Sequence, residues 1–141
     1  MEGWNNGPHF LEFEPPDIFH CHVRAPIEAH QIEKTTRIIR ENLEERRGIR
    51  IYFIAYMETP DSTFTPGARR VLSTRKVDWK GIAIVGGNSV FRAATNVMAR
   101  SVYILWGRQM PFKMVKTPKQ AREFIAELRA KEAAQAAAPK S

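Results

Sequence analysis

The stretch Ile49-Arg50-Ile51-Tyr52-Phe53-Ile54-Ala55-Tyr56-Met57, followed by a loop and then by Pro66-Gly67-Ala68-Arg69-Arg70, decides the fold class. The first segment is apolar on both of its alternating faces: Ile51, Phe53 and Ala55 on one, and Tyr52, Ile54 and Tyr56 on the other. A strand buried on both faces is typical of the centre of a parallel sheet. Pro66 can begin a helix, because the first helical residue has no helical partner for its N–H. A strand, a loop and a helix in this order predict an α/β fold.

The rest of the chain repeats this alternation. Hydrophobic periodicity predicts these further elements: strands His9–Glu14, Ile18–Arg24, Ile82–Val85 and Phe112–Val115, and helices over Pro26–Arg47, Pro66–Lys76, Val90–Trp106 and from Thr117-Pro118 to about residue 129. The order β-β-α-β-α-β-α-β-α predicts one mostly parallel five-stranded sheet with four helices. If strands are added in one direction, right-handed crossovers place most helices on one face and leave the other less covered.

Length and composition fit a single soluble domain. We expect an N-terminal arm over residues 1–8, a domain over 9–129 and an alanine-rich flexible tail over 130–141. Cys21 is the only cysteine, which excludes an internal disulfide and fits a reducing compartment. The N-terminus has no apolar signal-peptide core, and the longest apolar run, Val102–Trp106, is far shorter than the ~20 residues of a membrane span. The sequence therefore predicts a cytoplasmic protein without a transmembrane segment.

The formal net charge of +7 is unevenly distributed. Residues 1–64 carry 7 basic and 11 acidic side chains, residues 65–116 carry 10 and 1, and residues 117–141 carry 5 and 3. The basic middle segment favours an acidic partner, such as nucleic acid, anionic lipid or an acidic protein. Ordinary solubilising charge explains the same composition equally well.

Four local phrases carry a family resemblance: Phe13-Glu14-Pro15-Pro16-Asp17, Pro66-Gly67-Ala68-Arg69-Arg70, Gly81-Ile82-Ala83-Ile84-Val85-Gly86-Gly87, and Phe112-Lys113-Met114-Val115-Lys116-Thr117 before Gln120-Ala121-Arg122-Glu123-Phe124-Ile125. With the element order, they resemble the STAS fold of anti-sigma-factor antagonists over about residues 9–128. The bacterial SpoIIAA-like branch, which is related in fold to CRAL-TRIO lipid-binding domains, is the most similar. The resemblance implies a fold more strongly than a role, because that branch has no common activity.

In STAS antagonists the resemblance implies a phosphorylatable serine in an Asp-Ser-Ser/Thr-Gly phrase. Asp61-Ser62-Thr63 begins such a phrase here, but Phe64 replaces the glycine and the predicted helix begins later, at Thr65-Pro66. Ser62, Thr63 and Thr65 are therefore the candidate phosphorylation sites. The alternative is that Thr65 only caps the helix.

Two further groups of residues are candidate binding sites. An anion could bind at the helix N-terminus formed by Gly86-Gly87-Asn88-Ser89, with Arg92 beside it. The alternative is a tight turn that requires glycine, in which Asn88 or Ser89 only caps the helix. Basic and polar side chains at helical spacing extend this candidate surface for a polyanion or a partner: Arg69, Arg70, Arg92, Asn96, Arg100 and Tyr103.

A hairpin turning at Pro15-Pro16 would pair His9 with His22, next to His20, and such a cluster suits zinc or copper. The alternative to a metal site is an ordinary polar face of the sheet. A shift of one residue in the pairing register of the two strands would move His9 away from the face of His20 and His22.

No catalytic constellation is present in the sequence. Cys21 lies within a predicted strand, no serine lies in a nucleophile elbow, and no carboxylate pair has acid–base spacing. We therefore predict a non-catalytic STAS-like regulatory domain of a bacterium, without a cofactor, that binds another protein. The first alternative is a carrier of a lipid or small hydrophobic ligand, since Val102, Ile104 and Trp106 widen the apolar surface of their helix. The second is nonspecific binding of nucleic acid through the basic segment.

Self-association is also expected. One-directional strand order leaves the face of Tyr52, Ile54 and Tyr56 partly bare, and soluble monomers rarely expose a large apolar patch. A terminal segment with Trp4, a ligand or a second copy could cover it. A twofold homodimer is the prediction, because closed two-chain symmetry is the commonest oligomer.

Overall fold

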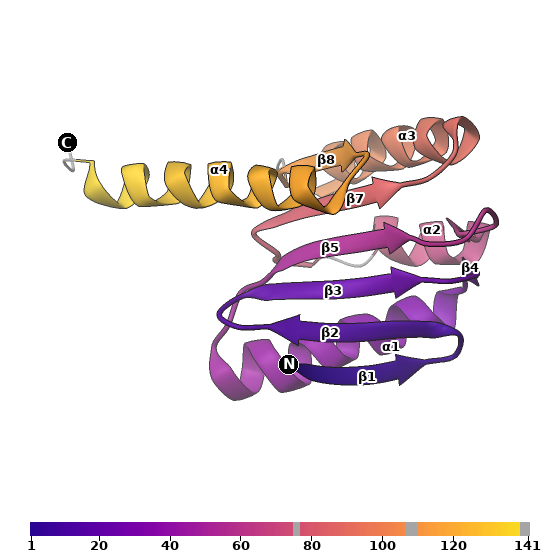
Figure 1. Ribbon diagram of the computed structural model, residues 1–141, viewed down its shortest axis with the longest axis horizontal. Coiled ribbons are helices and arrows are strands. Elements are labelled where there is room, and N and C mark those ends of the chain that lie inside the picture. Colours follow the sequence, from indigo (N-terminus) through magenta and orange to yellow (C-terminus); the bar gives the residue numbers. More distant parts are fainter. Residues whose placement is uncertain (75–76, 107–109, 139–141) are drawn as a thin grey trace.

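The computed structural model describes residues 1–74, 77–106 and 110–138, and the side chains of these residues except 73 and 98–106. Six strands form one sheet in the order β1-β2-β3-β5-β7-β8 (Figure 1). Their bounds are Glu2–Asn6, His9–Glu14, Ile18–Val23, Tyr52–Met57, Gly81–Gly86 and Phe112–Val115. The β1–β2–β3 part is antiparallel, whereas β3, β5, β7 and β8 are parallel. The predicted α/β class with a mixed, largely parallel sheet is thus confirmed.

Four helices flank the sheet. They are α1 (Ala29–Ile39, continued by the π-helical turn η1, Arg40–Glu45), α2 (Pro66–Thr74), α3 (Ser89–Trp106) and α4 (Pro118–Ala137). The helices α1, α2 and α3 lie behind the sheet in Figure 1, and α4 crosses in front of it. This is the arrangement that right-handed crossovers in one direction produce. Within the described residues, no helix combines the length and the apolar character that a bilayer span requires.

Two predicted boundaries are wrong. The N-terminal arm is strand β1, which pairs antiparallel with β2, so the sheet has six strands rather than five. The polar sequence of β1 gave no signal for a strand. Its inward residues are Trp4, which stacks on Phe19, and Asn6, which is buried. Helix α4 continues beyond residue 129 to Ala137, because alanine is the residue with the highest helix propensity; the flexibility of the tail stays a prediction.

A short second sheet, absent from the prediction, fixes the loop between β5 and α2. It pairs β4 (Pro26–Ile27) in parallel with β6 (Thr63–Phe64). The backbone of Thr65 also donates to Ile27, at 3.1 Å. The loop that carries the three candidate phosphorylation sites is therefore tied to the chain that follows β3.

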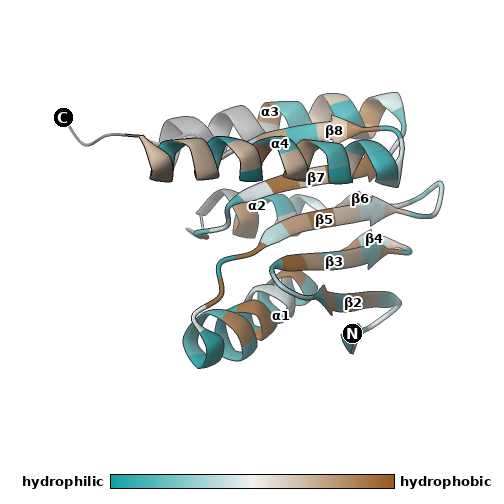
Figure 2. Cartoon of the chain, turned by 60° about the vertical axis from the view of Figure 1, so that its left-hand side comes forward, coloured by the Kyte–Doolittle hydropathy of each residue, from teal (hydrophilic) through white to brown (hydrophobic). Residues whose placement is uncertain are grey.

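The core has two parts, one on each side of the sheet. Behind the sheet, α1 and α2 pack on apolar residues of β2, β3 and β5 such as Leu11 and Phe19, both fully buried. In front, Ala121 and Ile125 of α4 pack on Tyr52 and Ile54. Figure 2 shows the contrast between the apolar strands β3, β5 and β7 and the mixed polar surface of α4. The expectation that Tyr52 and Ile54 lie on a bare patch is wrong, because α4 covers both, and the apolar patch that motivated a homodimer is absent there.

Helix α3 presents a different face to the core than predicted. The helical spacing of Val90, Ala94 and Val97 predicts that they face the core. In the structure Phe91 and Thr95 are buried instead, and Val90 and Val97 are 78% and 64% exposed. Gly86 and Gly87 have φ of 86° and 91°, and the turn that they make sets the rotation of the helix that follows. The side chains of Met98, Val102, Ile104, Leu105 and Trp106 lie outside the described residues.

Candidate functional site

The front of the sheet is covered unequally. Helix α4 lies over β7 and β8 and packs on Tyr52 and Ile54 of β5, and no described helix lies in front of β2 and β3 (Figure 1). We call this uncovered region the open face; it is formed by Gly3, Asn5, Phe10, Glu12, Glu14, His20, His22 and Tyr56. Alternate strand residues point forward, which places these side chains together although three strands supply most of them. The region is polar, so it differs in kind from the two apolar parts of the core.

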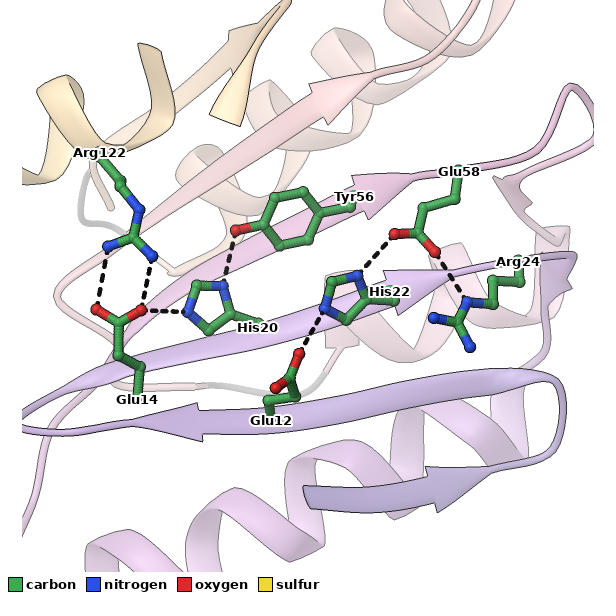
Figure 3. A network of polar contacts seen from close by, with 8 residues as sticks. All are labelled: Glu12, Glu14, His20, His22, Arg24, Tyr56, Glu58 and Arg122. Carbon is green, nitrogen blue, oxygen red and sulfur yellow. Dashed lines mark hydrogen bonds and ion pairs between the residues drawn. The ribbon is translucent and has the colours of Figure 1, made fainter. Parts of the chain in front are cut away.

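Hydrogen bonds connect Tyr56, His20 and Glu14 in series on the open face, and Arg122 binds the Glu14 end of the series (Figure 3). The Tyr56 hydroxyl lies 2.7 Å from His20 Nδ1, and His20 Nε2 lies 3.1 Å from Glu14 Oε1. Arg122 of α4 donates to both oxygens of Glu14, at 3.0 and 2.6 Å. A carboxylate can only accept, so His20 donates from Nε2 and its Nδ1 accepts the phenolic proton.

The second histidine of the open face lies between two carboxylates. His22 Nδ1 is 2.7 Å from Glu58 Oε2, and His22 Nε2 is 2.9 Å from Glu12 Oε1. Arg24 donates to the other oxygen of Glu58 at 2.8 Å. Each ring nitrogen of His22 therefore faces a carboxylate oxygen, whereas His20 faces one carboxylate and one phenol. His20 and His22 thus have different hydrogen-bonding roles, although they are two residues apart on one strand.

Aromatic rings join the two halves of the network. The ring centroids of His22 and Tyr56 are 4.8 Å apart with an interplanar angle of 10°, and those of His20 and Tyr56 are 5.7 Å apart. Phe10 lies beside His22, with centroids 6.2 Å apart. The rings of His20 and His22 thus stack on Tyr56, and the Phe10 ring is tilted against His22.

Charge and burial shift the ionisation of several groups. Hydrogen bonds from Arg122 lower the pKa of Glu14 to about 2. The pKa of His20 is lowered, because the effect of burial outweighs the hydrogen bond to Glu14, which alone would raise it. Burial also raises the pKa of Tyr56. At neutral pH these three groups are therefore a carboxylate, a neutral imidazole and a phenol, and in this state His20 donates to Glu14 and accepts from Tyr56.

Hydrogen bonds link the side chains of this network in the order Glu14, His20 and Tyr56. Burial raises the pKa of Tyr56, so its hydroxyl keeps its proton at neutral pH and donates to His20. Burial likewise opposes ionisation of Glu58, but hydrogen bonds from Arg24 and His22 outweigh it and lower the pKa of that carboxyl. The groups stabilise one another and hold a fixed arrangement of polar atoms.

The predicted cluster of His9, His20 and His22 does not form. The loop between β2 and β3 has three residues, so Phe10 rather than His9 pairs with His22. His9 points to the other side of the sheet, where it is 1% exposed, contacts Gln31 at 3.1 Å and accepts from the Arg24 backbone. Among the described residues, no group of three or more metal-ligating side chains has the geometry of a metal site.

The candidate phosphorylation sites have structural roles. Ser62 is 3% exposed; its hydroxyl donates to the Val23 carbonyl at 2.7 Å and accepts from the Thr59 backbone at 3.0 Å. Thr65 accepts from the Ala68 backbone at 3.2 Å, which makes it the cap of α2. Thr63 is partly exposed in β6. A kinase would have to open the loop to reach Ser62, and phosphorylation of this segment stays a prediction.

The structure separates the candidate anion and partner residues. Asn88 accepts from the Phe91 backbone at 2.8 Å and so caps α3, beside the exposed Ser89. Arg69 and Arg70 lie on α2. Arg92 lies beside Lys113 and Lys116 in a hollow between α4 and β8. The side chain of Arg100 lies outside the described residues.

Sequence reasoning missed most of the open-face network. It identified His20 and His22 as neighbours on one strand face but not their partners Glu12, Glu14, Tyr56 and Arg122. The alternation His20, His22 beside Glu12, Glu14 was a usable signal, because two antiparallel strands with polar residues at alternate positions can share a polar face. The contribution of Arg122, which is 108 residues from Glu14, had no local signal.

Stability should fall when the pH decreases below neutral. The unfolded chain binds protons at histidine near the ordinary pKa of 6.5, whereas burial lowers the pKa of His9 and of His20 in the folded chain. Stability from these groups is therefore present above pH 6.5 and is lost as the pH falls through their folded pKa values. Glu14 adds a further loss as the pH falls from about 4.5 to about 2. Urea unfolding between pH 8 and 4 measures the effect.

A His20→Phe variant keeps a ring of similar size but cannot take up a proton. Its stability should depend less on pH between 7 and 5 than that of the parent chain. An unchanged pH dependence would show that His20 is not buried in its neutral form.

Comparison with known proteins leaves the family open. No protein-family model, no curated protein and no solved structure matches the chain.

Proposed function

We propose that this chain is a non-catalytic STAS-like regulatory domain that binds another protein through its open face. The observation that carries the proposal is the hydrogen-bonded network in which Glu14, Tyr56 and Arg122 surround the buried His20, on a sheet face that no described helix covers. Side chains that are already fixed lose little conformational entropy on binding. Tyrosine and arginine are also the residues that contribute most to protein–protein interfaces.

The charges of the open face favour a protein over a polyanion. Glu12, Glu14 and Glu58 lie among Arg24 and Arg122, so phosphate groups would meet carboxylates as well as guanidinium groups. A protein surface with both signs of charge can complement this pattern. Nonspecific nucleic-acid binding remains the alternative for the basic segment elsewhere on the chain. Ligand carriage remains the alternative for α3, where Val90 and Val97 are exposed.

The proposal extends to the setting of the domain. We expect it to act in the bacterial cytoplasm without a cofactor. A homodimer also remains possible as one form of partner, but the apolar patch that first motivated it is covered by α4. Sedimentation therefore belongs among the controls of the binding experiments.

A charge-swap variant tests the function. Glu12→Lys with Arg24→Glu exchanges two charges of the open face and keeps the net charge of the chain. The matched control is Glu33→Lys with Arg37→Glu, which makes the same exchange on the exposed surface of α1 behind the sheet. Each protein is used as bait in an extract of host cells, and bound proteins are quantified by mass spectrometry.

We expect at least one protein to be retained by the parent chain and by the α1 control, and to be depleted about tenfold or more by the open-face swap. Circular dichroism establishes that both variants are folded. If every retained protein binds all three baits equally, the open face is not the binding surface.

A further inference from the structure

A second surface, the outer edge of β8, has the features of a peptide-binding site and does not depend on the open face. Strand β8 pairs with β7 on one side and ends the sheet on the other. The Pro111 carbonyl accepts from the Ile82 backbone at 2.9 Å, which sets the direction of the backbone groups that follow. In a parallel ladder, alternate residues point their N–H and C=O to the same side. Phe112 and Met114 therefore point theirs away from β7.

These outward groups are unpaired within the part of the chain that the structure describes. None of the hydrogen bonds among the described residues uses the N–H or C=O of Phe112 or Met114. A hollow of about 340 Å³ lies along the strand between α4 and the start of α3. It is lined by residues 113–116, so an incoming chain could reach the strand itself.

The charges around the hollow indicate what it would accept. Arg92, Lys113 and Lys116 contribute three positive charges. On the α4 wall lie Glu123 and Glu127, and Glu123 is also 3.8 Å from Lys119. The strand side of the hollow is thus cationic, in keeping with the basic middle segment of the sequence.

A second copy of the chain would fit this edge poorly. Pairing two β8 strands would bring Lys113 and Lys116 of both copies together, and like charges at an interface are unfavourable. Lysine on a sheet edge commonly discourages such pairing. The same lysines would attract an extended segment that carries carboxylates. Lys113 itself lies over the Phe124 ring, with its Nζ 6.0 Å from the ring centroid.

We propose that the β8 edge binds an extended acidic segment of another protein by strand addition. Backbone hydrogen bonds to Phe112 and Met114 would supply the pairing, and Arg92, Lys113 and Lys116 would select the charge. The binding partner is thus defined by an extended backbone and by acidic side chains at alternate positions.

Fluorescence anisotropy with synthetic peptides tests this inference on the full chain. The probe is a fluorescein-labelled octapeptide of alternating glutamate and valine. Two ligand controls leave the protein unchanged: the same peptide N-methylated at every amide, which cannot donate, and a peptide with lysine in place of glutamate. The protein variants are Lys113→Glu with Lys116→Glu, and Lys131→Glu at the far end of α4 as a control.

Saturable binding of the acidic probe is expected. N-methylation should weaken it about tenfold, as the loss of two backbone hydrogen bonds predicts. The lysine peptide should bind the parent chain no more tightly than the N-methylated peptide does. The Lys113→Glu/Lys116→Glu variant should bind the acidic probe equally weakly, and Lys131→Glu should bind it with the affinity of the parent chain. Amide exchange at Phe112 and Met114 should slow when the peptide is bound.

Three results would overturn the inference. Equal binding of the plain and N-methylated peptides would show attraction by charge alone, and no binding of the probe would remove the site. Dimerisation that protects the amides of Phe112 and Met114 would assign the edge to a second copy. None of these results bears on the open-face swap, so the two proposals fail separately.

Discussion

Replacing Ile125 by aspartate should lower the free energy of unfolding by about 4 kcal/mol. Ile125 is 2% exposed and packs with Ala121 on the front of the sheet, where Tyr52 and Ile54 are its partners. Aspartate at this position removes the apolar contact and buries a carboxylate without a partner. The midpoint of thermal unfolding should fall by about 10–15 °C, which calorimetry or circular dichroism measures.

The neighbouring residue provides the control for Ile125→Asp. Ala126 is exposed on the same turn of α4, so Ala126→Asp introduces the same residue and the same charge. It should change the free energy of unfolding by less than about 1 kcal/mol. Similar losses in both variants would mean that α4 does not pack on the sheet through Ile125. Tyr52 and Ile54 would then again be an exposed patch that favours dimerisation.

Replacing Asn6 by alanine should cost about 2–3 kcal/mol. Asn6 is 2% exposed, and its side-chain amide donates to the Gln31 carbonyl at 2.8 Å and to the Thr35 hydroxyl at 3.0 Å. These bonds join the edge strand β1 to α1, so the variant leaves buried acceptors with fewer donors and a small cavity. Urea unfolding at neutral pH gives the loss directly.

Asn5 is the matched control for Asn6. It is the preceding residue of β1, and its exposed side chain points to the opposite side of the sheet. Asn5→Ala should leave stability within about 0.5 kcal/mol of the parent. If Asn6→Ala is equally mild, β1 is not anchored to α1 through this side chain, and the N-terminal segment behaves as the arm that the sequence suggests.

The central part of the fold was predictable because its signals are local. Strands β3, β5 and β7 have apolar residues on both faces or at alternate positions, and Pro66 and Thr117-Pro118 mark the beginnings of α2 and α4. These patterns depend on neighbours within a few residues. They give the order of strands and helices and the face on which most helices lie.

What could not be predicted depends on distant partners. Strand β1 is polar, and its pairing with β2 is stabilised by the buried contact of Asn6 with α1, 25 residues away. The direction of α3 follows from Gly86 and Gly87, whose conformation the periodicity of the helix does not reveal. The hairpin register differed by one residue, which was enough to move His9 to the other side of the sheet.

The open face has the same explanation. Its histidines were visible in the sequence, but its character comes from the ion pair of Glu14 with Arg122, and from Tyr56, which the sequence suggested as part of an apolar patch. Only the packing of α4 against the sheet brings Arg122 to Glu14. The polar network therefore results from tertiary structure rather than from a motif.

Site-specific photo-crosslinking tests the central claim most directly. A photoreactive amino acid is placed at Asn5, beside Phe10 on the open face, and in a separate chain at Arg37, on the exposed surface of α1. Each chain is expressed in host cells and irradiated, and the crosslinked products are identified by mass spectrometry. The account predicts a discrete adduct with one protein from position 5, its loss in the Glu12→Lys/Arg24→Glu background, and no such adduct from position 37. An adduct with the same protein from position 37 and none from position 5 would contradict it.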